Sequence, residues 1–366
     1  MTEFSATDRQ HMRRALELAA NGLNTTTPNP SVGCVIADGE HVISESWHER
    51  AGEGHAEARA LALAGTRSAG KTVYVTLEPC TVHGRTPPCV DALIAAEVNE
   101  VVCAMGDPNP DVNGQGYERL RAAGIAVRHG LFADIAAGQN EGYISRQSRG
   151  RPFVTLKWAQ SLDGATAMRS GESQWITGDA AREDAHRLRA RACAILTGVG
   201  TVLADDPLMT ARLPGVVRQP RRVIVDSQQR TPKQARILTP DADVLMVSPL
   251  ACDNWGLADA VECWQSPASS DGRVDLTALL QHLAALGTNE LMVEAGATLT
   301  GALMADGLVD RIVAYVAPAV LGSETRGVAM TPSWTALSDG VRLTIENVIT
   351  VGRDLRVQLV PESETN

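Results

Sequence analysis

The chain has 366 residues, of which 44% are hydrophobic, and its 33 basic and 43 acidic side chains give a formal net charge of −10. A typical domain has about 100 to 200 residues, so two domains are expected. The acidic balance argues against extensive nucleic-acid binding, which needs a basic face. No apolar run approaches the roughly 18 residues that cross a bilayer. Five of the seven cysteines are scattered without close pairing, namely Cys34, Cys103, Cys193, Cys252 and Cys263. The odd count, with no signal peptide, predicts a reducing, cytoplasmic setting.

The first part of the chain alternates short apolar strands with amphipathic helices. Strands are predicted at residues 34–38, 41–46, 72–77, 100–105 and 125–130, and helices begin at His55 and at Cys89. This alternation is typical of a three-layer α/β/α domain. A polar stretch with glycine and proline, residues 147–152, marks a boundary, so we place the first domain at residues 1–146.

The same alternation resumes after the boundary. Strands are predicted at residues 153–159, 193–199, 221–226, 242–248, 289–296 and 311–318, and helices at 180–192, 276–287 and 299–307. The pattern predicts a second α/β sheet, which we place in a domain over residues 150–362.

Three potential zinc ligands and one further carboxylate stand out in the first domain. His55, Cys80 and Cys89 offer one imidazole and two thiols, a set that leaves the fourth position of a tetrahedral zinc open to water. Zinc lowers the pKa of that water toward neutrality. Glu57, two residues after His55, is placed to move a proton from the water to departing ammonia. We interpret the motif as a hydrolytic deaminase site, because a structural zinc site usually has four protein ligands.

Several loop residues of the first domain have two possible interpretations. Eight residues separate Cys80 from Cys89, where the usual deaminase signature has two. Within this insertion Arg85 is either a contact for an anionic group or a solvated arginine. Residues 27–34 and 107–110 both place asparagine between prolines, which suits either ligand recognition or an ordinary turn.

The second domain is less informative taken residue by residue. Residues 293–301 run from a strand through glycine into a helix, an arrangement whose free N–H groups can hold a phosphate. The segment lacks the G-x-G-x-x-G pattern of dinucleotide-binding sheets. Arg187, Arg189 and Arg191 alternate along a helix, so they do not share one face. Taken alone, residues 293–301 predict only a strand-to-helix turn, which is common in proteins, and do not identify a cofactor.

Sequence blocks in both halves resemble the bifunctional riboflavin-biosynthesis deaminase/reductase. The first half contains TPNPSVGCV, HAE, TLEPC, HGRTPPC and DPNP, and the second contains SLDG, SGESQWITG, RLRA, ILTGVGTVLADDPLMTAR, VIVDS and VEAGATLTGAL in order. The resemblance implies a cytidine-deaminase-like domain followed by a dihydrofolate-reductase-like α/β domain. It also implies zinc-dependent deamination of 2,5-diamino-6-ribosylamino-4(3H)-pyrimidinone 5′-phosphate, then NADPH-dependent reduction of the ribosyl side chain to ribityl.

The resemblance also implies roles for individual residues. In the first domain His55, Cys80 and Cys89 bind zinc, Glu57 is the catalytic acid and base, and the substrate contacts are Asn29, His48, Arg85, Asp107 and Asn109. In the second domain NADPH contacts Ala159, Trp175, Thr201, Asp205, Ser227, Gly296, Ala297, Thr298, Leu299, Thr300, Gly301 and Ala302. The substrate contacts there are Lys157, Ser173, Arg189, Met209, Arg212 and Glu294.

Two positions depart from the family pattern. Val82 stands where the family usually has histidine, and Ala165 where it tends to have lysine or arginine. Valine forms no hydrogen bond, so one substrate contact is weakened, at a cost of about 0.5–1.5 kcal/mol. The resemblance implies a small-molecule partner, with no nucleic acid and no membrane, and we expect a homo-oligomer.

Two other interpretations remain open at this point. A nucleoside or RNA deaminase with a fused nucleotide-binding domain shares the zinc core but needs a basic groove. A zinc-stabilised sensor scaffold without catalysis gives Glu57 no purpose.

Overall fold

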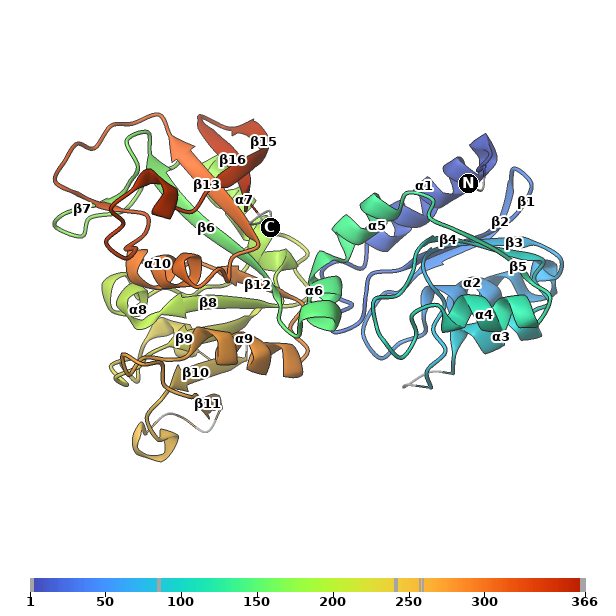
Figure 1. The fold of residues 1–366 in the computed structure, drawn as a ribbon, viewed down its shortest axis with the longest axis horizontal. Coiled ribbons are helices and arrows are strands. Elements are labelled where there is room, and N and C mark those ends of the chain that lie inside the picture. The colour runs from blue at the N-terminus through green and yellow to red at the C-terminus, as the bar shows by residue number, and fades with distance from the viewer. Residues whose placement is uncertain (1–2, 84–86, 240–242, 257, 259, 363–366) are drawn as a thin grey trace. The chain divides into compact units, whose positions relative to one another are not determined.

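A computed structural model describes residues 3–83, 87–239, 243–256, 258 and 260–362 (Figure 1). The chain forms two compact units, unit 1 over Met1–Arg151 and unit 2 over Pro152–Asn366. Both are mixed α/β structures, which confirms the predicted fold class, and each predicted strand and helix is present with ends shifted by a few residues. None of the helices in the described ranges is long and apolar enough to span a bilayer.

Unit 1 contains one five-stranded sheet in the order β2-β1-β3-β4-β5. Its strands are β1 (Gly33–Asp38), β2 (His41–Trp47), β3 (Thr72–Leu77), β4 (Glu100–Met105) and β5 (Ala126–His129). β1 is antiparallel to β2 and β3, whereas β3, β4 and β5 run parallel. β3 and β4 are almost fully buried, as parallel strands covered on both faces should be.

Helices cover both faces of this sheet. They are α1 (Ala6–Ala20), α2 (Ala56–Ala64), α3 (Cys89–Ala95), α4 (Gln115–Ala122), α5 (Ala133–Gln139) and α6 (Glu141–Arg149). α2, α3 and α4 pack on one face and α1 and α5 on the other (Figure 1). A Cβ on Gly33 would lie 1.9 Å from the carbonyl oxygen of Ala15, so glycine is what allows α1 to approach β1.

Unit 2 contains a nine-stranded sheet in the order β11-β10-β9-β8-β12-β6-β13-β16-β15. Its strands are β6 (Phe153–Ser161), β8 (Ala194–Gly198), β9 (Arg221–Val225), β10 (Val244–Ser248), β11 (Val261–Gln265), β12 (Glu290–Val293), β13 (Arg311–Ala317), β15 (Leu343–Val351) and β16 (Asp354–Pro361). The strands from β11 to β13 are parallel, and β16 and β15 continue the sheet antiparallel. β7 (Ala165–Met168) and β14 (Thr325–Gly327) form a separate pair.

The helices of unit 2 also lie on both faces of the sheet. They are α7 (Asp179–Arg191), α8 (Val199–Asp205), α9 (Leu276–Ala285) and α10 (Ala297–Ala305). α9 and α10 pack with one apolar cluster, and α7 and α8 pack with the clusters of the opposite face. β8 and β12 are neighbours, and a glycine is the N-cap residue of the helix that follows each of them, Gly198 for α8 and Gly296 for α10. In open parallel sheets ligands bind at such carboxyl ends.

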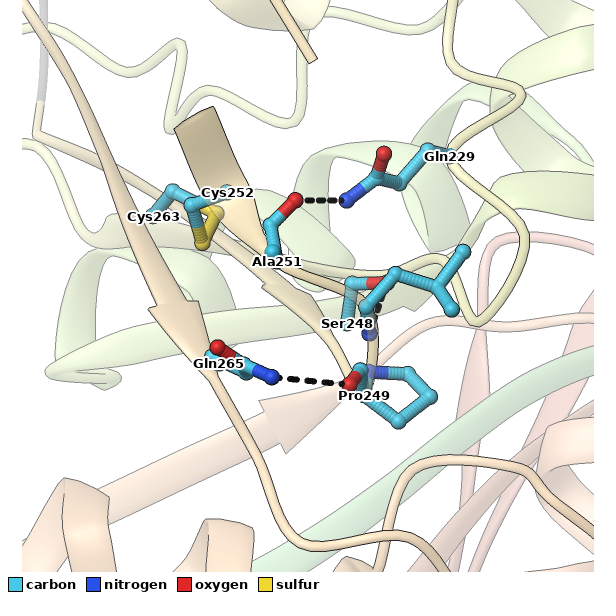
Figure 2. Close-up of a disulfide and its surroundings, with 8 residues drawn as sticks. Gln229, Ser248, Pro249, Ala251, Cys252, Cys263 and Gln265 are labelled. Atoms are coloured by element: carbon cyan, nitrogen blue, oxygen red, sulfur yellow. Dashed lines mark hydrogen bonds between the residues drawn. A yellow bond between two sulfur atoms is a disulfide. The ribbon is translucent and has the colours of Figure 1, made fainter. Parts of the chain in front are cut away.

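A disulfide joins Cys252 and Cys263 beside the edge strand β11 (Figure 2). The expectation that Cys252 and Cys263 are unpaired is therefore wrong. Cys252 follows β10 and Cys263 lies in the neighbouring strand β11, and their Cα atoms are 5.9 Å apart. Two side-chain amides fix the neighbouring backbone. Gln229 donates to the Ala251 carbonyl at 2.9 Å, and Gln265 donates to that of Pro249 at 3.2 Å (Figure 2).

Candidate active sites

His55, Cys80 and Cys89 come together at one end of the unit 1 sheet. His55 is at the N-cap position of α2, Cys80 follows β3, and Cys89 is the first residue of α3. The His55 Nδ1 atom lies 3.2 Å from Cys89 Sγ and 3.5 Å from Cys80 Sγ. Ligand atoms around one tetrahedral zinc are about 3.5 Å apart, so the set fits this metal. Within the described residues no fourth His, Cys, Asp or Glu completes the cluster.

The electrostatics of the two cysteines suit metal binding. The hydrogen bond with Cys89 lowers the pKa of Cys80 to about 4, and His55 contributes in the same direction. The Cys89 backbone N–H also points at Cys80 Sγ, at 3.4 Å. Hydrogen bonding with Cys80 and burial raise the pKa of Cys89. Cys80 is therefore held as a thiolate, the form in which cysteine binds metals.

Glu57 lies in the first turn of α2 and is 4% exposed. Burial and the nearby Cys80 thiolate raise the pKa of its carboxyl group to about 7. Such a group accepts and returns a proton readily at neutral pH, as catalytic carboxyl groups in other enzymes do. Glu57 is not a member of the ligand cluster, so it is available for proton transfer.

His48 and Asn29 form a hydrogen-bonded pair next to this cluster. The His48 ring is buried, and its centroid is 5.3 Å from that of His55. His48 Nδ1 lies 3.2 Å from the Gly54 carbonyl oxygen, so Nδ1 carries the proton and Nε2 accepts from Asn29 Nδ2 at 3.1 Å. This arrangement orients the Asn29 amide and leaves its Oδ1 atom as an acceptor.

Asp107 and Asn109 lie in the loop after β4. Asp107 Oδ1 accepts from the Asn109 N–H at 2.8 Å and from the Tyr143 hydroxyl at 3.0 Å. Burial raises the pKa of Asp107 to about 6. The Asn109 side chain accepts from the Asp111 N–H at 3.1 Å and so shapes its own turn. The remaining predicted contact of this unit, Arg85, lies outside the described residues.

Glu78 connects this loop to the segment that carries Cys80, a role that sequence reasoning missed. Its carboxylate accepts backbone N–H groups of Asp107 at 3.2 Å, Gly114 at 3.0 Å and Gly116 at 2.9 Å. Glu78 stands two residues before Cys80. The loop after β4 is thus anchored to the segment that carries Cys80. The only signal in the sequence was the position of Glu78 within TLEPC.

Unit 2 contains a cavity of about 2350 Å³ at the carboxyl ends of its parallel strands. Ligand sites are typically about 300–1,000 Å³, so this cavity has room for a dinucleotide and a second ligand together. It brings together most of the predicted unit 2 residues, namely Lys157, Ala159, Ser173, Trp175, Arg189, Thr201, Asp205, Met209, Arg212, Ser227, Glu294, Gly296, Ala297, Thr298, Leu299 and Ala302.

Thr300 and Gly301 do not line the cavity. Thr300 is 2% exposed, and its hydroxyl donates to the Ala295 carbonyl at 3.4 Å. A Cβ on Gly301 would lie 1.9 Å from the carbonyl oxygen of Met330. Both residues therefore serve the packing of α10 rather than the lining of the cavity.

A buried carboxylate and two cations form the polar centre of the cavity. Arg189 donates to Glu294 through two bonds of 2.5 and 2.9 Å, and Lys157 Nζ lies 3.5 Å from the same carboxylate. Burial favours protonation of Glu294, but the two cations outweigh it and lower its pKa to about 2. Glu294 is thus an anion that fixes the positions of both cations.

His186 is a further lining residue that sequence reasoning did not single out. Its Nδ1 atom accepts the Arg212 N–H at 3.3 Å. Burial and the cations of Arg189 and Arg212 lower the pKa of His186 to about 4, so the ring is neutral. His186 thereby orients the segment that carries Arg212 while adding no charge.

Comparisons with known proteins cover both units. Residues 5–105 match the cytidine and deoxycytidylate deaminase zinc-binding region, and residues 152–357 match the RibD C-terminal domain. The chain is 45% identical over 365 residues to riboflavin biosynthesis protein RibD of Escherichia coli (strain K12), covering 96% of this chain and 99% of that protein. It is 42% identical over 374 residues to RibD of Haemophilus influenzae, covering 99% and 100%.

Solved structures agree over the same extent. A structure of Acinetobacter baumannii RibD superposes with a TM-score of 0.90 at 41% identity, covering 97% of this chain and 99% of that chain. A Thermotoga maritima diaminohydroxyphosphoribosylaminopyrimidine deaminase/5-amino-6-(5-phosphoribosylamino)uracil reductase superposes with a TM-score of 0.88 at 31% identity, covering 97% and 99%. The chain therefore belongs to the RibD family of bifunctional riboflavin-biosynthesis enzymes, in which a zinc-binding deaminase domain precedes a reductase domain.

Proposed function

We propose that unit 1 deaminates 2,5-diamino-6-ribosylamino-4(3H)-pyrimidinone 5′-phosphate and that unit 2 reduces the ribosyl chain of the resulting 5-amino-6-(5-phosphoribosylamino)uracil. The observation that carries this proposal is the three-ligand cluster of His55, Cys80 and Cys89 beside the non-ligand carboxyl of Glu57. The same chain holds a cavity large enough for a dinucleotide and a sugar phosphate. The match to family members over almost the whole chain supports the pairing of the two steps.

In the deamination step water replaces an amino group on the pyrimidine ring. Zinc, when bound by the three ligands, supplies a water of lowered pKa. Glu57 accepts a proton from that water at its carboxylate and delivers it to the departing amine, so that a carbon–oxygen bond forms and ammonia leaves. Asn29 and Asp107 hold the substrate through their free acceptor oxygens.

In the reduction step the ribosyl ring first opens: the bond between C1′ and the ring oxygen breaks, that oxygen takes up the proton lost from the amine nitrogen, and an imine forms. A hydride then adds to the imine carbon and a proton to its nitrogen. NADPH, when bound, supplies the hydride. Lys157 and Arg189, both held by Glu294, position the sugar, and the ammonium of Lys157 is the proton source that lines the cavity. Arg212 forms no ion pair with a described carboxylate and lines the same cavity, so it is placed to neutralise the substrate phosphate.

The carboxyl end of β9 favours NADPH over NADH. In dinucleotide-binding sheets a strand-end carboxylate binds the ribose of NAD, whereas an arginine accommodates the 2′-phosphate of NADP. Asp226 follows β9 but is fully buried, and its carboxylate accepts the N–H and hydroxyl of Thr231, both at 2.7 Å. Arg230 lines the cavity and forms no ion pair with the described residues. We therefore assign the 2′-phosphate to Arg230.

Replacing Arg230 by alanine should weaken NADPH binding by about 10- to 100-fold, the value of a hydrogen bond to a charged group, and should leave NADH binding unchanged. Titration of nucleotide fluorescence measures both affinities without turnover. Arg326→Ala serves as the control, because Arg326 also lines the cavity but belongs to β14. An equal loss for both nucleotides in Arg230→Ala would contradict the assignment.

We further propose that a second copy of the chain covers β15. Three apolar residues of this edge strand are exposed to solvent, with exposed fractions of 60% for Ile345, 48% for Val348 and 40% for Ile349. An exposed apolar edge strand tends to pair with another chain. Light scattering on the full-length protein should give the mass of a dimer or a larger assembly, and a strictly monomeric mass would refute this proposal.

Mass spectrometry of the diaminopyrimidinone phosphate, incubated with zinc-loaded protein, tests the two-step function. Without NADPH the product should carry one oxygen in place of one amino group, and after NADPH is added it should gain two hydrogens. Deamination of cytidine in place of this substrate would favour a nucleoside deaminase. A zinc-loaded protein that turns over neither compound would refute the proposal.

A further inference from the structure

Two loops that carry proposed substrate contacts lie on either side of the zinc-ligand end of β3. Residues 27–32 precede β1 and include Asn29, and residues 107–113 follow β4 and include Asp107. β1 and β4 both neighbour β3, so no strand ladder joins one loop to the other. The distance between the two loops is therefore not set by hydrogen bonds between their own strands, and other contacts must fix it.

Asn140, between α5 and α6, binds the first loop. Its Oδ1 accepts the Ser31 N–H at 2.7 Å, and its Nδ2 donates to the Ser31 carbonyl at 3.0 Å and to that of Ala136 at 3.3 Å. Asn140 is 4% exposed, and Ser31 is 3% exposed. The Asn140 amide thus provides hydrogen-bond partners for both the N–H and the carbonyl of Ser31, a buried residue that lies outside the strands.

Side chains one and two turns farther along contact both loops. Tyr143 is 7% exposed and donates its hydroxyl to Asp107 Oδ1 at 3.0 Å, and Arg146 Nη2 donates to the Pro28 carbonyl at 3.0 Å. Positions three apart lie on the same face of a helix, so Asn140, Tyr143 and Arg146 present one surface to the site. Asp107 Oδ1 accepts two hydrogen bonds, from the Asn109 N–H and from the Tyr143 hydroxyl, whereas Oδ2 has no hydrogen-bond partner among the described residues.

We propose that Asn140 and Tyr143 are positioning residues for the deaminase, through which α6 fixes Asn29 Oδ1 and Asp107 Oδ2 relative to one another. The inference rests on the proposed function of unit 1. The two oxygens form a pair of acceptors, so the site selects a substrate that offers amine or hydroxyl groups at both places. Neither positioning residue hydrogen-bonds a zinc ligand within the described chain. Removing either side chain should weaken substrate binding without lowering the zinc content.

The test compares Asn140→Ala and Tyr143→Phe with the unaltered full-length protein, all zinc-loaded and without NADPH. Asn140→Ala should raise the KM of deamination by about 10-fold, and Tyr143→Phe by about 3-fold, in line with the hydrogen bonds that each removes. The kcat should stay within about 2-fold and zinc content should not change. Calorimetric titration of the diaminopyrimidinone phosphate into the same variants carrying Glu57→Gln gives the affinity in the absence of turnover.

Matched controls separate positioning from general stability. Gln139→Ala removes a comparable amide that donates to the Leu16 carbonyl at 3.0 Å, and Tyr117→Phe removes a buried hydroxyl that donates to the Met105 carbonyl at 3.0 Å. Both controls should leave KM unchanged. If Asn140→Ala does not fold, the inference is tested by comparing the KM of Tyr143→Phe with that of Tyr117→Phe.

Two results would overturn the inference. One is an unchanged KM and affinity in Tyr143→Phe and Asn140→Ala, and the other is loss of zinc or an equal effect in the matched controls. If the unaltered protein does not deaminate the substrate, the proposed function fails. The binding comparison in the Glu57→Gln background then still decides the inference.

Discussion

Replacement of Glu57 by glutamine is expected to lower the deamination rate by about 10²- to 10⁴-fold, the usual contribution of a general acid and base. Glutamine has the shape of the buried carboxyl but neither accepts nor releases a proton near neutral pH. Zinc content should not change, since Glu57 is not part of the ligand cluster. Product formation in the absence of NADPH, measured with metal analysis of the same sample, checks both statements.

The matched control for this experiment is Glu53→Gln, which changes an exposed carboxylate in the loop before the cluster. That variant should deaminate at the normal rate. Glu57→Gln should still reduce the deaminated intermediate with NADPH, because the residues proposed for reduction all lie in unit 2. Near-normal deamination by Glu57→Gln would instead support a zinc-stabilised scaffold whose carboxyl group has no catalytic role.

Replacement of Glu294 by glutamine should abolish reduction and lower the free energy of unfolding of unit 2 by about 3–5 kcal/mol, because two buried cations lose their counter-ion. The side chains of Arg189 and Lys157 are only 14% and 17% exposed, so water does not take over that role. Urea denaturation followed by tryptophan fluorescence measures the change in stability. Glu324→Gln, which breaks an ion pair whose side chains are 80% and 70% exposed, should cost less than about 1 kcal/mol.

The same carboxylate predicts an acid-dependent loss of stability in the unaltered protein. The pKa of Glu294 is about 2 in the folded state, against an ordinary value of 4.5. Because the folded-state pKa is the lower one, the stabilisation is complete above about pH 4.5 and is lost as the pH falls toward 2. The difference corresponds to roughly 3 kcal/mol. Glu294→Gln should lack this decline, and parallel stability curves for the two proteins would refute the assignment.

Residues with a strong local signal were predictable from the sequence. His55, Cys80 and Cys89 together with Glu57 form a combination whose chemistry admits few uses. The structure brings the candidate ligand atoms of His55, Cys80 and Cys89 within 4.8 Å of one another. Strands with buried apolar residues were equally clear. Loop residues such as Asn29 and Asp107 were ambiguous, because a turn and a binding loop use the same amino acids.

What the sequence did not reveal depends on contacts between distant parts of the chain. Asn140 binds a residue 109 positions away, and Tyr143 binds one 36 positions away, so nothing near either residue marks its role. β15 and β16 were missed because neither shows the buried alternation of a typical strand: β15 is exposed along most of its length, and β16 is mostly half-buried. The Cys252–Cys263 pair was missed for a related reason, since Cys263 lies in the unpredicted strand β11.

The disulfide has a consequence for how unit 2 opens locally. β11 has a partner on one side only, and its middle residue, Cys263, pairs in register with Met246 of β10. The covalent bond ties that same residue to the segment just after β10. β11 therefore cannot separate from the sheet without also displacing the segment that follows β10. Its amides should exchange hydrogen more slowly than those of an edge strand without a disulfide. Proteases that cut frayed edges should accordingly find little access at this end of the sheet while the bond is intact.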